Sequence, residues 1–310
     1  MPLGFAKSIL SRYEAPAAGG NGYYFTDETS TASSDQAGYI LTKGSSPFAA
    51  STDVSTVFWY RCNSGSDKTK IWHGQTVASP TPGRWYASFV SDSRIELHTF
   101  QGFNAMTAMF VGPLTGSVRE DVYDGAWHCV MMYKNVLATS PPDLPTDFMG
   151  VWDDRVGTYS QYGTGSTGTA EVTNYDLYPT SPDTMADIET LCFAFRDYTQ
   201  LNPTNMTTGD QFSGTSFDIG PVWIYDKKID FSSSTVRDYY YDATATDGYV
   251  DGGTDGTAGG AEQPAIYMYH DGTDWKNGGT KFNSTATKVT KGSGDITATN
   301  TDGPGSGGTT

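Results

Sequence analysis

Apolar and polar residues alternate along much of this chain with a period of two, which is the pattern of short β-strands. The segment 94–100, RIELHTF, places apolar side chains at alternate positions and polar ones between them. Such alternation is typical of a strand that turns one face to a core and the other to water. Further short apolar runs, separated by turn residues, lie at 38–41, 54–62, 70–73, 84–90, 105–111, 127–133, 148–156 and 191–195. The pattern predicts an all-β domain.

The segment 214–241 is the one around which we expect the other strands to be arranged. Its run FDIGPVWIY is apolar on both faces, so we expect an interior strand that is covered on both sides. Pro221 has no amide donor and is expected at the start of that strand or beside a bulge. The aspartate and serines at 230–233 are suitable N-cap residues, and they predict one or two helical turns up to Tyr240. Another helical turn is predicted within 181–187.

Composition supports a β-rich fold with many tight turns. The 310 residues include 36 Gly and 15 Pro, and 14% of them are aromatic. Charged residues make up 17%, against about 25% in an average globular domain. Aspartate is plentiful and glutamate scarce. Because aspartate prefers turns and caps while glutamate prefers helix interiors, this bias disfavours a helical fold.

Changes in composition divide the chain into three parts. Residues 1–35 are rich in Gly, Ala and Ser, and we interpret them as either an N-terminal arm that docks on a neighbour or the first edge strand. Residues 36–242 hold the strand-like runs and are predicted to form a sandwich. Residues 243–310 form a Gly- and Asp-rich C-terminal extension. Its last part, 292–310, has few large side chains to bury, so we expect a tail that is flexible or ordered only by a partner.

The formal net charge of −16 makes nucleic acids and anionic membranes unfavourable partners, because both are polyanions. No run of about twenty apolar residues is present, so no transmembrane helix is predicted. Residues 1–20 contain a short apolar stretch that is interrupted by charge, and they do not resemble a secretory signal peptide. We therefore expect neither a nucleic-acid partner nor a membrane partner.

Three cysteines, Cys62, Cys129 and Cys192, lie in apolar strand-like runs and show no CxxC spacing. A cysteine in such a run behaves as a small buried hydrophobe, so we interpret all three as free thiols. The alternative is a disulfide or a metal site. Free thiols indicate assembly in a reducing cytoplasm.

Three stretches, taken in this order, resemble the laminin-G-like, concanavalin-A-like jelly-roll family. They are VFWYR at 57–61, DGAWHCV at 124–130 and FDIGPVWIY at 217–225. The resemblance implies a two-sheet antiparallel jelly-roll sandwich that spans about 38–241. In such a sandwich we expect three large side chains to pack between the sheets: Trp59, Trp127 and Trp223.

A second resemblance is to virion proteins of tailed phages. It rests on IYDKKIDF at 224–231 and on the Gly- and Asp-rich stretch that follows. It implies a non-enzymatic capsid-decoration or tail or fibre protein, which assembles in the bacterial cytoplasm with other virion proteins and as a homo-oligomer. A glycan-binding adhesin that contacts the host surface is the alternative. A polysaccharide-degrading enzyme is a third, minority interpretation.

Catalytic motifs do not stand out in the sequence. The chain has no ExDxE pattern of the kind that places paired carboxylates on a hydrolase strand. The four histidines show no HExxH spacing, and no GxSxG serine motif accompanies them. We therefore predict no catalytic residues, no organic cofactor and no enzymatic activity.

Calcium is the one ion that the sequence suggests, because it prefers oxygen-rich loops. Weak candidate ligands are Asp251 and Asp255 in DGGTDGT, and Asp153 and Asp154 near a strand end. The alternative is that these aspartates form turns beside glycine, which needs no metal.

Overall fold

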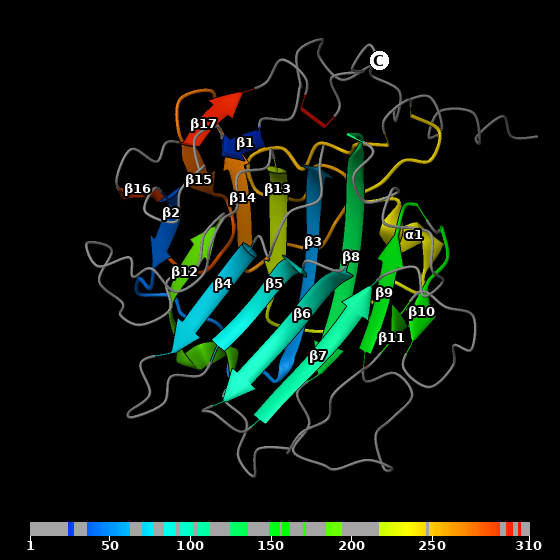
Figure 1. The fold of residues 1–310 in the computed structure, drawn as a ribbon, viewed down its shortest axis with the longest axis horizontal. Coiled ribbons are helices and arrows are strands. Elements are labelled where there is room, and N and C mark those ends of the chain that lie inside the picture. The colour runs from blue at the N-terminus through cyan, green and yellow to red at the C-terminus, as the bar shows by residue number, and fades with distance from the viewer. Residues whose placement is uncertain are drawn as a thin grey trace, which may run out of the picture.

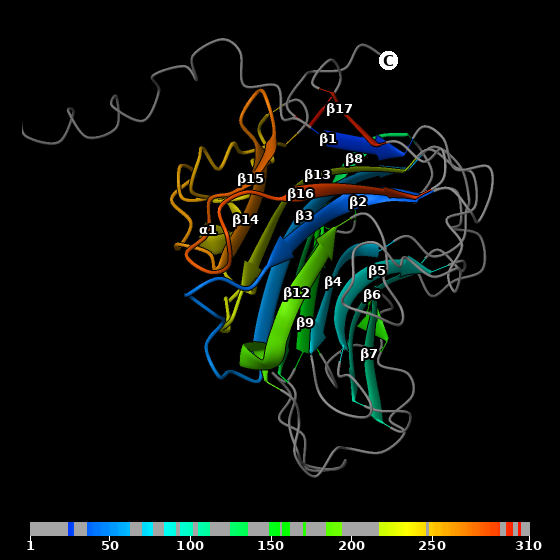
Figure 2. The same cartoon turned by 90° about the vertical axis from the view of Figure 1, so that its left-hand side faces the viewer.

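The computed structural model of the protein shows two antiparallel β-sheets packed face to face (Figure 1; Figure 2). It describes residues 24–27, 36–62, 70–76, 84–90, 94–101, 105–111, 125–135, 149–155, 157–161, 170–171, 184–193, 217–245, 248–291, 296–299 and 303–304. The predicted two-sheet jelly-roll sandwich is confirmed. None of the helices described is both long and apolar enough to cross a membrane.

The first sheet, sheet A, is centred on β3, β8 and β13. In spatial order it contains β10 (Ser160–Gln161), β9 (Met149–Asp153), β8 (Trp127–Asn135), β3 (Asp53–Cys62), β13 (Phe217–Tyr225), β1 (Tyr24–Asp27) and β17 (Ile296–Thr299). β14 (Ile266–His270) also pairs with β13, and β15 (Trp275–Asn277) pairs with β14.

The second sheet, sheet B, lies in front of sheet A in Figure 1. Its order is β11 (Ala170–Glu171), β7 (Ala105–Val111), β6 (Arg94–Gln101), β5 (Arg84–Val90), β4 (Lys70–Thr76), β12 (Ile188–Phe193), β2 (Gln36–Thr42) and β16 (Thr287–Lys291). Both predicted helical turns are confirmed: α1 spans Ser234–Arg237, and a 3-10 turn spans Met185–Asp187.

The side chains between the sheets form a contiguous apolar cluster, which we call the inner core. Sheet A contributes Phe58 and Val130, and sheet B contributes Trp72 and Leu191, all fully buried. Each such side chain stabilises the fold by about 1.5–3 kcal/mol through the apolar area that it removes from water. The indole Nε1 of Trp72 also donates a hydrogen bond to Thr56 Oγ1 over 3.1 Å, which links the two sheets.

A second cluster lies on the opposite face of sheet A, and we call it the outer cluster. Residues 226–245 and 248–265 fold back over this face and cover it, on the side away from sheet B (Figure 2). Its members are Val57, Trp59, Cys129, Met131, Tyr133, Trp152, Trp223, Tyr225, Ile229, Phe231, Tyr240, Ala261 and Tyr267. The central strands β3, β8 and β13 are therefore buried on both faces, as the sequence predicted for the segment that forms β13.

The prediction that Trp59, Trp127 and Trp223 pack between the sheets is wrong. Trp59 and Trp223 are fully buried in the outer cluster, and Trp127 packs half-buried against it. Successive strand residues point to opposite faces, so the inward positions of Phe58 and Tyr60 turn Trp59 outward. Both faces of these strands are apolar, and the pattern therefore did not show which face meets sheet B.

The predicted irregularity at Pro221 is confirmed. The register of β13 against β3 shifts between Ile219 and Val222, as expected where a proline cannot donate to the ladder. Because of this bulge, both Ile219 and Val222 point into the inner core, while Trp223 points into the outer cluster. The bulge thus sets which side chains of β13 serve each core.

Strands from both ends of the chain complete the sheets. β1 pairs with β13 on one side and with β17 on the other, and β16 pairs with β2 in sheet B. The expectation that 292–310 is flexible or ordered only by a partner is therefore wrong for Ile296–Thr299, which pairs with β1 of its own chain. The proposed domain boundaries at 35 and 242 stay predictions.

Glycines of the C-terminal extension allow its backbone to lie directly on the outer cluster. A Cβ atom at Gly252 would lie 2.8 Å from Trp223 Cζ2, and one at Gly256 would lie 3.0 Å from Trp223 Nε1. Gly256 also has a φ of +85°, which glycine adopts without strain. The Trp223 Nε1 group donates to the Gly256 carbonyl over 3.1 Å. Backbone atoms thus supply much of the contact that large side chains supply elsewhere.

Candidate functional site

The centre of the outer cluster is a set of interlocked aromatic rings. The ring centroids of Trp223 and Tyr267 are 4.8 Å apart, and Tyr240 meets Trp223 edge-on at 5.7 Å. The hydroxyls of Tyr225 and Tyr240 lie 2.7 Å apart, and Tyr225 donates to the Glu262 carbonyl over 3.2 Å. Burial raises the pKa of both phenols, so they stay neutral hydrogen-bonding groups. These contacts give the cluster a fixed packing.

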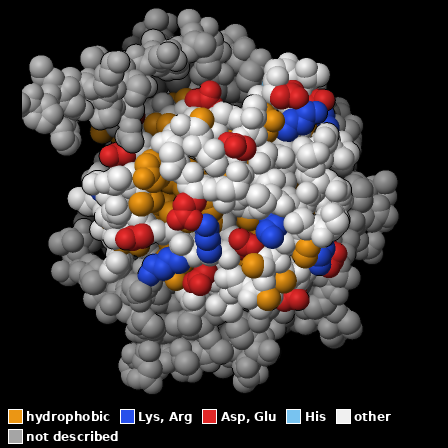
Figure 3. Space-filling model, turned by 180° about the vertical axis from the view of Figure 1, so that it is seen from behind, with side chains coloured by type: hydrophobic (Ala, Val, Ile, Leu, Met, Phe, Trp, Pro, Cys, Tyr) orange, Lys and Arg blue, Asp and Glu red, His pale blue; other side chains and the backbone are white. Residues whose placement is uncertain are grey.

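Around this centre lies a set of half-buried aromatic side chains, which we call the aromatic rim. Its members are Trp127, Tyr159, Tyr239, Tyr241, Tyr249 and Tyr269. Tyr241 stacks on buried Trp59 with an interplanar angle of 20°, and Tyr269 stacks on buried Tyr267 at 10° and 5.3 Å. Seen from behind, this side of the molecule shows apolar side chains beside Asp, Glu, Lys and Arg (Figure 3).

Charged side chains accompany the aromatic rim. The Arg61 guanidinium lies 5.1 Å from the centre of the Trp127 ring and is held there by Asp218, with 2.6 Å between Arg61 Nη2 and Asp218 Oδ2. Lys276 is the cross-strand partner of Tyr269, and its Nζ lies 3.3 Å from Asp274. The rim therefore combines aromatic faces with hydrogen-bonding groups.

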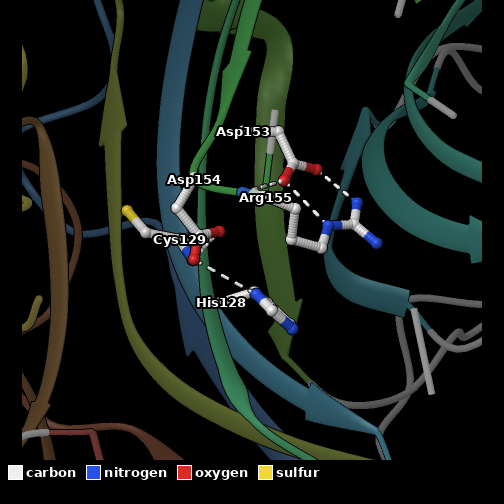
Figure 4. Close-up of polar contacts among 5 residues, drawn as sticks. All are labelled: His128, Cys129, Asp153, Asp154 and Arg155. Atoms are coloured by element: carbon white, nitrogen blue, oxygen red, sulfur yellow. Dashed lines mark hydrogen bonds and ion pairs between the residues drawn. The ribbon is translucent and has the colours of Figure 1, made fainter. Parts of the chain in front are cut away.

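A buried polar network adjoins the outer cluster where β9 ends (Figure 4). Asp154 Oδ1 accepts a hydrogen bond from the Cys129 amide over 3.0 Å, and Asp154 Oδ2 lies 3.1 Å from His128 Nδ1. The Asp154 amide donates to the Cys129 carbonyl over 3.2 Å. The carboxylate thus pairs with β8 just beyond the point where β9 stops. His128 is 6% exposed, so this pair is a buried one.

Asp153 and Arg155 form a second ion pair in the same turn. Asp153 is 2% exposed and accepts from Arg155 Nε over 2.8 Å and from Arg155 Nη2. The Arg155 amide donates to the same carboxylate over 3.0 Å. This bidentate geometry is the one in which a buried carboxylate and guanidinium best replace their lost hydration.

The carboxylates of all four candidate calcium ligands already have partners within the protein, either hydrogen-bond donors or a charged side chain. Asp153 and Asp154 have the partners given above, whereas Asp251 accepts from the Gly253 amide over 2.8 Å and Asp255 from the Thr257 amide over 2.9 Å. These short-range bonds are those of aspartate in turns. Across the parts of the chain that the structure describes, no three His, Cys, Asp or Glu side chains form a metal-binding group. Calcium binding stays a prediction.

The cysteine interpretation is confirmed for two of the three positions. Cys129 and Cys192 are buried and form no disulfide, and burial raises the pKa of the Cys129 thiol well above its usual value. Such a thiol is a poor nucleophile, because the thiolate is the reactive form. The side chain of Cys62 lies outside the described residues.

The aromatic rim was not foreseen from the sequence. The sequence predicted that Trp127 lies between the two sheets, and none of the tyrosines between 239 and 269 was singled out as a binding residue. The available signal was the density of tyrosine in a segment that otherwise contains Gly and Asp. That density could be interpreted as an aromatic rim only once this segment was known to cover an aromatic face of sheet A.

The raised pKa of the Asp154 carboxyl makes the stability of the protein depend on pH in a specific way. Burial raises the pKa of Asp154, although the hydrogen bond and the charge of His128 oppose this shift. A carboxyl with a raised pKa in the folded state favours folding when protonated, and that contribution is lost as the pH rises through the folded pKa. We therefore expect Asp154→Asn to gain stability relative to the native protein as the pH rises from about 4 through the folded pKa, with little change above it.

Urea unfolding of the two proteins at a series of pH values measures this difference. Asp230→Asn, on an exposed turn, is a suitable control. If the free energies of unfolding of the native protein and Asp154→Asn differ by the same amount at every pH, the raised pKa assigned to Asp154 is contradicted.

No protein-family model and no curated protein matches this chain. Similar solved structures include a heptameric SAP-like pentraxin from Limulus polyphemus, with 9% identity over 88% of this chain and 97% of that chain, at a TM-score of 0.43. Domains LG4-5 of the mouse laminin alpha1 chain show 13% identity over 68% of this chain and 44% of that chain, at a TM-score of 0.37. The binding domain of botulinum neurotoxin serotype D shows 10% identity over 83% of this chain and 58% of that chain, also at 0.37. At these identities and TM-scores, the function of this chain has to be argued from its own residues.

Proposed function

We propose that this chain is a non-enzymatic, lectin-like β-sandwich that binds glycans at its aromatic rim. The observation that supports this function is that rim side chains are half exposed while they stack on fully buried rings. A sugar ring has apolar C–H faces, which pack favourably on an aromatic ring. Because stacking already fixes the orientation of the Tyr241 and Tyr269 rings, little conformational entropy is lost when a sugar binds them.

The hydroxyl groups of a sugar need polar neighbours beside the aromatic face. Two positions of the rim supply them. Arg61 lies over Trp127, and Lys276 with Asp274 lies across the strand pair from Tyr269. The rim thus offers both apolar and polar contacts to one ligand.

The acidic side chains support binding rather than hydrolysis. A glycosidase needs two carboxyl groups placed on either side of the scissile bond. Asp153 and Asp154 instead hold Arg155 and His128, and Asp251 and Asp255 accept from their own turns. A non-enzymatic role predicts that polysaccharides incubated with the protein release no new reducing ends.

A glycan array with the intact protein, followed by titration of a retained glycan, tests the proposed function. We expect Tyr241→Ala and Tyr269→Ala each to weaken binding about tenfold, since loss of one aromatic contact costs roughly 1.4 kcal/mol. Tyr241→Phe and Tyr269→Phe keep the ring and are expected to bind nearly as well as the native protein. The proposal fails if no glycan is retained, or if the alanine and phenylalanine variants bind equally.

A second candidate is a structural role in the particle of a tailed phage, in which the protein is a decoration, tail or fibre component assembled in the bacterial cytoplasm. The likeness of segment 224–231 and its Gly- and Asp-rich continuation to phage virion proteins supports this role. The buried thiol of Cys129, which forms no disulfide, agrees with assembly in a reducing compartment. Other virion proteins and further copies of this chain would be its partners. Localising the chain in an electron-microscopy map of the particle is the test, and absence from purified particles would contradict it.

A further inference from the structure

In a short part of the C-terminal extension, Gly303 and Pro304 are both buried, and Pro304 lies against the outer face of sheet A. The position of Pro304 is defined by Gly220 at the bulge of β13. A Cβ atom at Gly220 would lie 3.1 Å from Pro304 Cγ, 2.9 Å from Trp59 Cβ and 3.5 Å from Trp127 Cζ3. Pro304 therefore occupies a site formed by Gly220, Trp59 and Trp127, which we call the proline site.

The chemistry of the proline site suits its occupant. Proline docks on aromatic side chains with little loss of entropy, because its ring already restricts the backbone. Gly220 permits this approach, since any larger residue would place an atom between Pro304 and the sheet. Trp127 is held in orientation by the Arg61 guanidinium above its ring.

The proline site overlaps the aromatic rim at Trp127. Pro304 follows soon after β17, whose Ile296–Thr299 backbone is anchored on β1. The anchor keeps the proline close to its site, so its effective concentration there is high. A ligand that needs the same area of Trp127 has to displace Pro304 first.

We propose that Gly303 and Pro304 form a C-terminal latch, which covers part of Trp127 and competes with a glycan for the aromatic rim. This inference rests on the proposed glycan-binding function and adds its regulation. Only molecules in which the latch is open can bind the glycan. The apparent affinity of the rim is therefore its intrinsic affinity multiplied by the fraction of open molecules. If the latch is closed in about nine molecules of ten, its removal raises the apparent affinity about tenfold.

The test compares two truncated chains with the full chain. Deletion of 303–310 removes the latch and keeps β17, whereas deletion of 305–310 keeps Gly303 and Pro304 and serves as the matched control. Gly220→Ala in the full chain is a second way to displace Pro304. Urea unfolding and circular dichroism establish that each variant is folded.

The first readout does not depend on a glycan. Acrylamide quenching of tryptophan fluorescence is measured in each chain and in the same chain with Trp127→Phe, so that the difference reports on Trp127. We expect deletion of 303–310 and Gly220→Ala to increase quenching of Trp127, and deletion of 305–310 to leave it unchanged. Equal quenching in all chains would overturn the latch.

The second readout is affinity for a glycan that the full chain retains. We expect binding to strengthen about tenfold on deletion of 303–310 and to stay unchanged on deletion of 305–310. Equal affinity in all chains, with Trp127 more exposed, would overturn the competition while the proposed function stands. If no chain retains a glycan, the proposed function fails and the competition fails with it.

Discussion

Trp223→Ala is expected to lower the free energy of unfolding by about 3–5 kcal/mol, the usual effect of removing a buried tryptophan. Trp223 is fully buried in the outer cluster, where it contacts Tyr240 and Tyr267 and donates to the Gly256 carbonyl. The substitution therefore removes the support on which residues 226–245 and 248–265 rest. We expect this covering segment to become sensitive to protease while the inner core stays folded.

Urea unfolding measures the loss, and limited proteolysis with mapping of the first cleavage sites shows where the chain opens. Trp127→Ala is the matched control, because this tryptophan is half-buried against the same cluster and its loss should cost less. A loss below about 1 kcal/mol for Trp223→Ala would show that the outer cluster is not a second core, since such a loss is usual for a surface position.

Arg155→Met is expected to destabilise the protein by about 3–5 kcal/mol, because it leaves a buried carboxylate without its counter-charge. The carboxylate is that of Asp153, which is 2% exposed and receives two side-chain bonds from Arg155. Most of the loss comes from the unpaired charge rather than from the missing bonds. The double variant Asp153→Leu with Arg155→Met removes both charges and should recover most of the stability.

A double-mutant cycle of Asp153→Leu, Arg155→Met and the double variant, measured by urea unfolding, gives the coupling energy of the pair. The exposed pair Lys227 and Glu262 provides the control cycle, for which we expect at most about 1 kcal/mol. Additive effects of the two single variants at Asp153 and Arg155 would contradict the assignment of a coupled buried pair.

The two substitutions probe different parts of one arrangement. Sheet A carries the inner core on one face and the outer cluster on the other. The turn after β9 contacts both, because Asp154 accepts from Cys129 of the outer cluster and Arg155 lies over the ring of Tyr60 of the inner core. The aromatic rim is the exposed margin of the outer cluster. Its rigidity, and with it the proposed glycan contact, therefore depends on a layer that is separate from the core between the sheets.

Local features of the fold were predictable from the sequence alone. The period of two identified most strands, the proline marked the bulge of β13, and the serine-rich stretch after β13 marked α1. The apolar surroundings of Cys129 and Cys192 indicated that both are buried and form no disulfide. Each of these features depends only on residues that are close together in the sequence and on the backbone properties of those residues, so it can be predicted from one sequence.

Only the tertiary structure decided which contacts form between distant segments. Alternation along β3 and β8 shows which side chains share a face, but both faces are apolar, so it does not show which of them meets sheet B. The pairing of β1 with β17 joins the two ends of the chain, and no local pattern encodes it. Gly252 and Gly256 indicate a flexible segment when read alone, yet their small size is what lets the backbone pack on Trp223. The aromatic rim and the proline site consequently appear only when the C-terminal extension is folded onto sheet A.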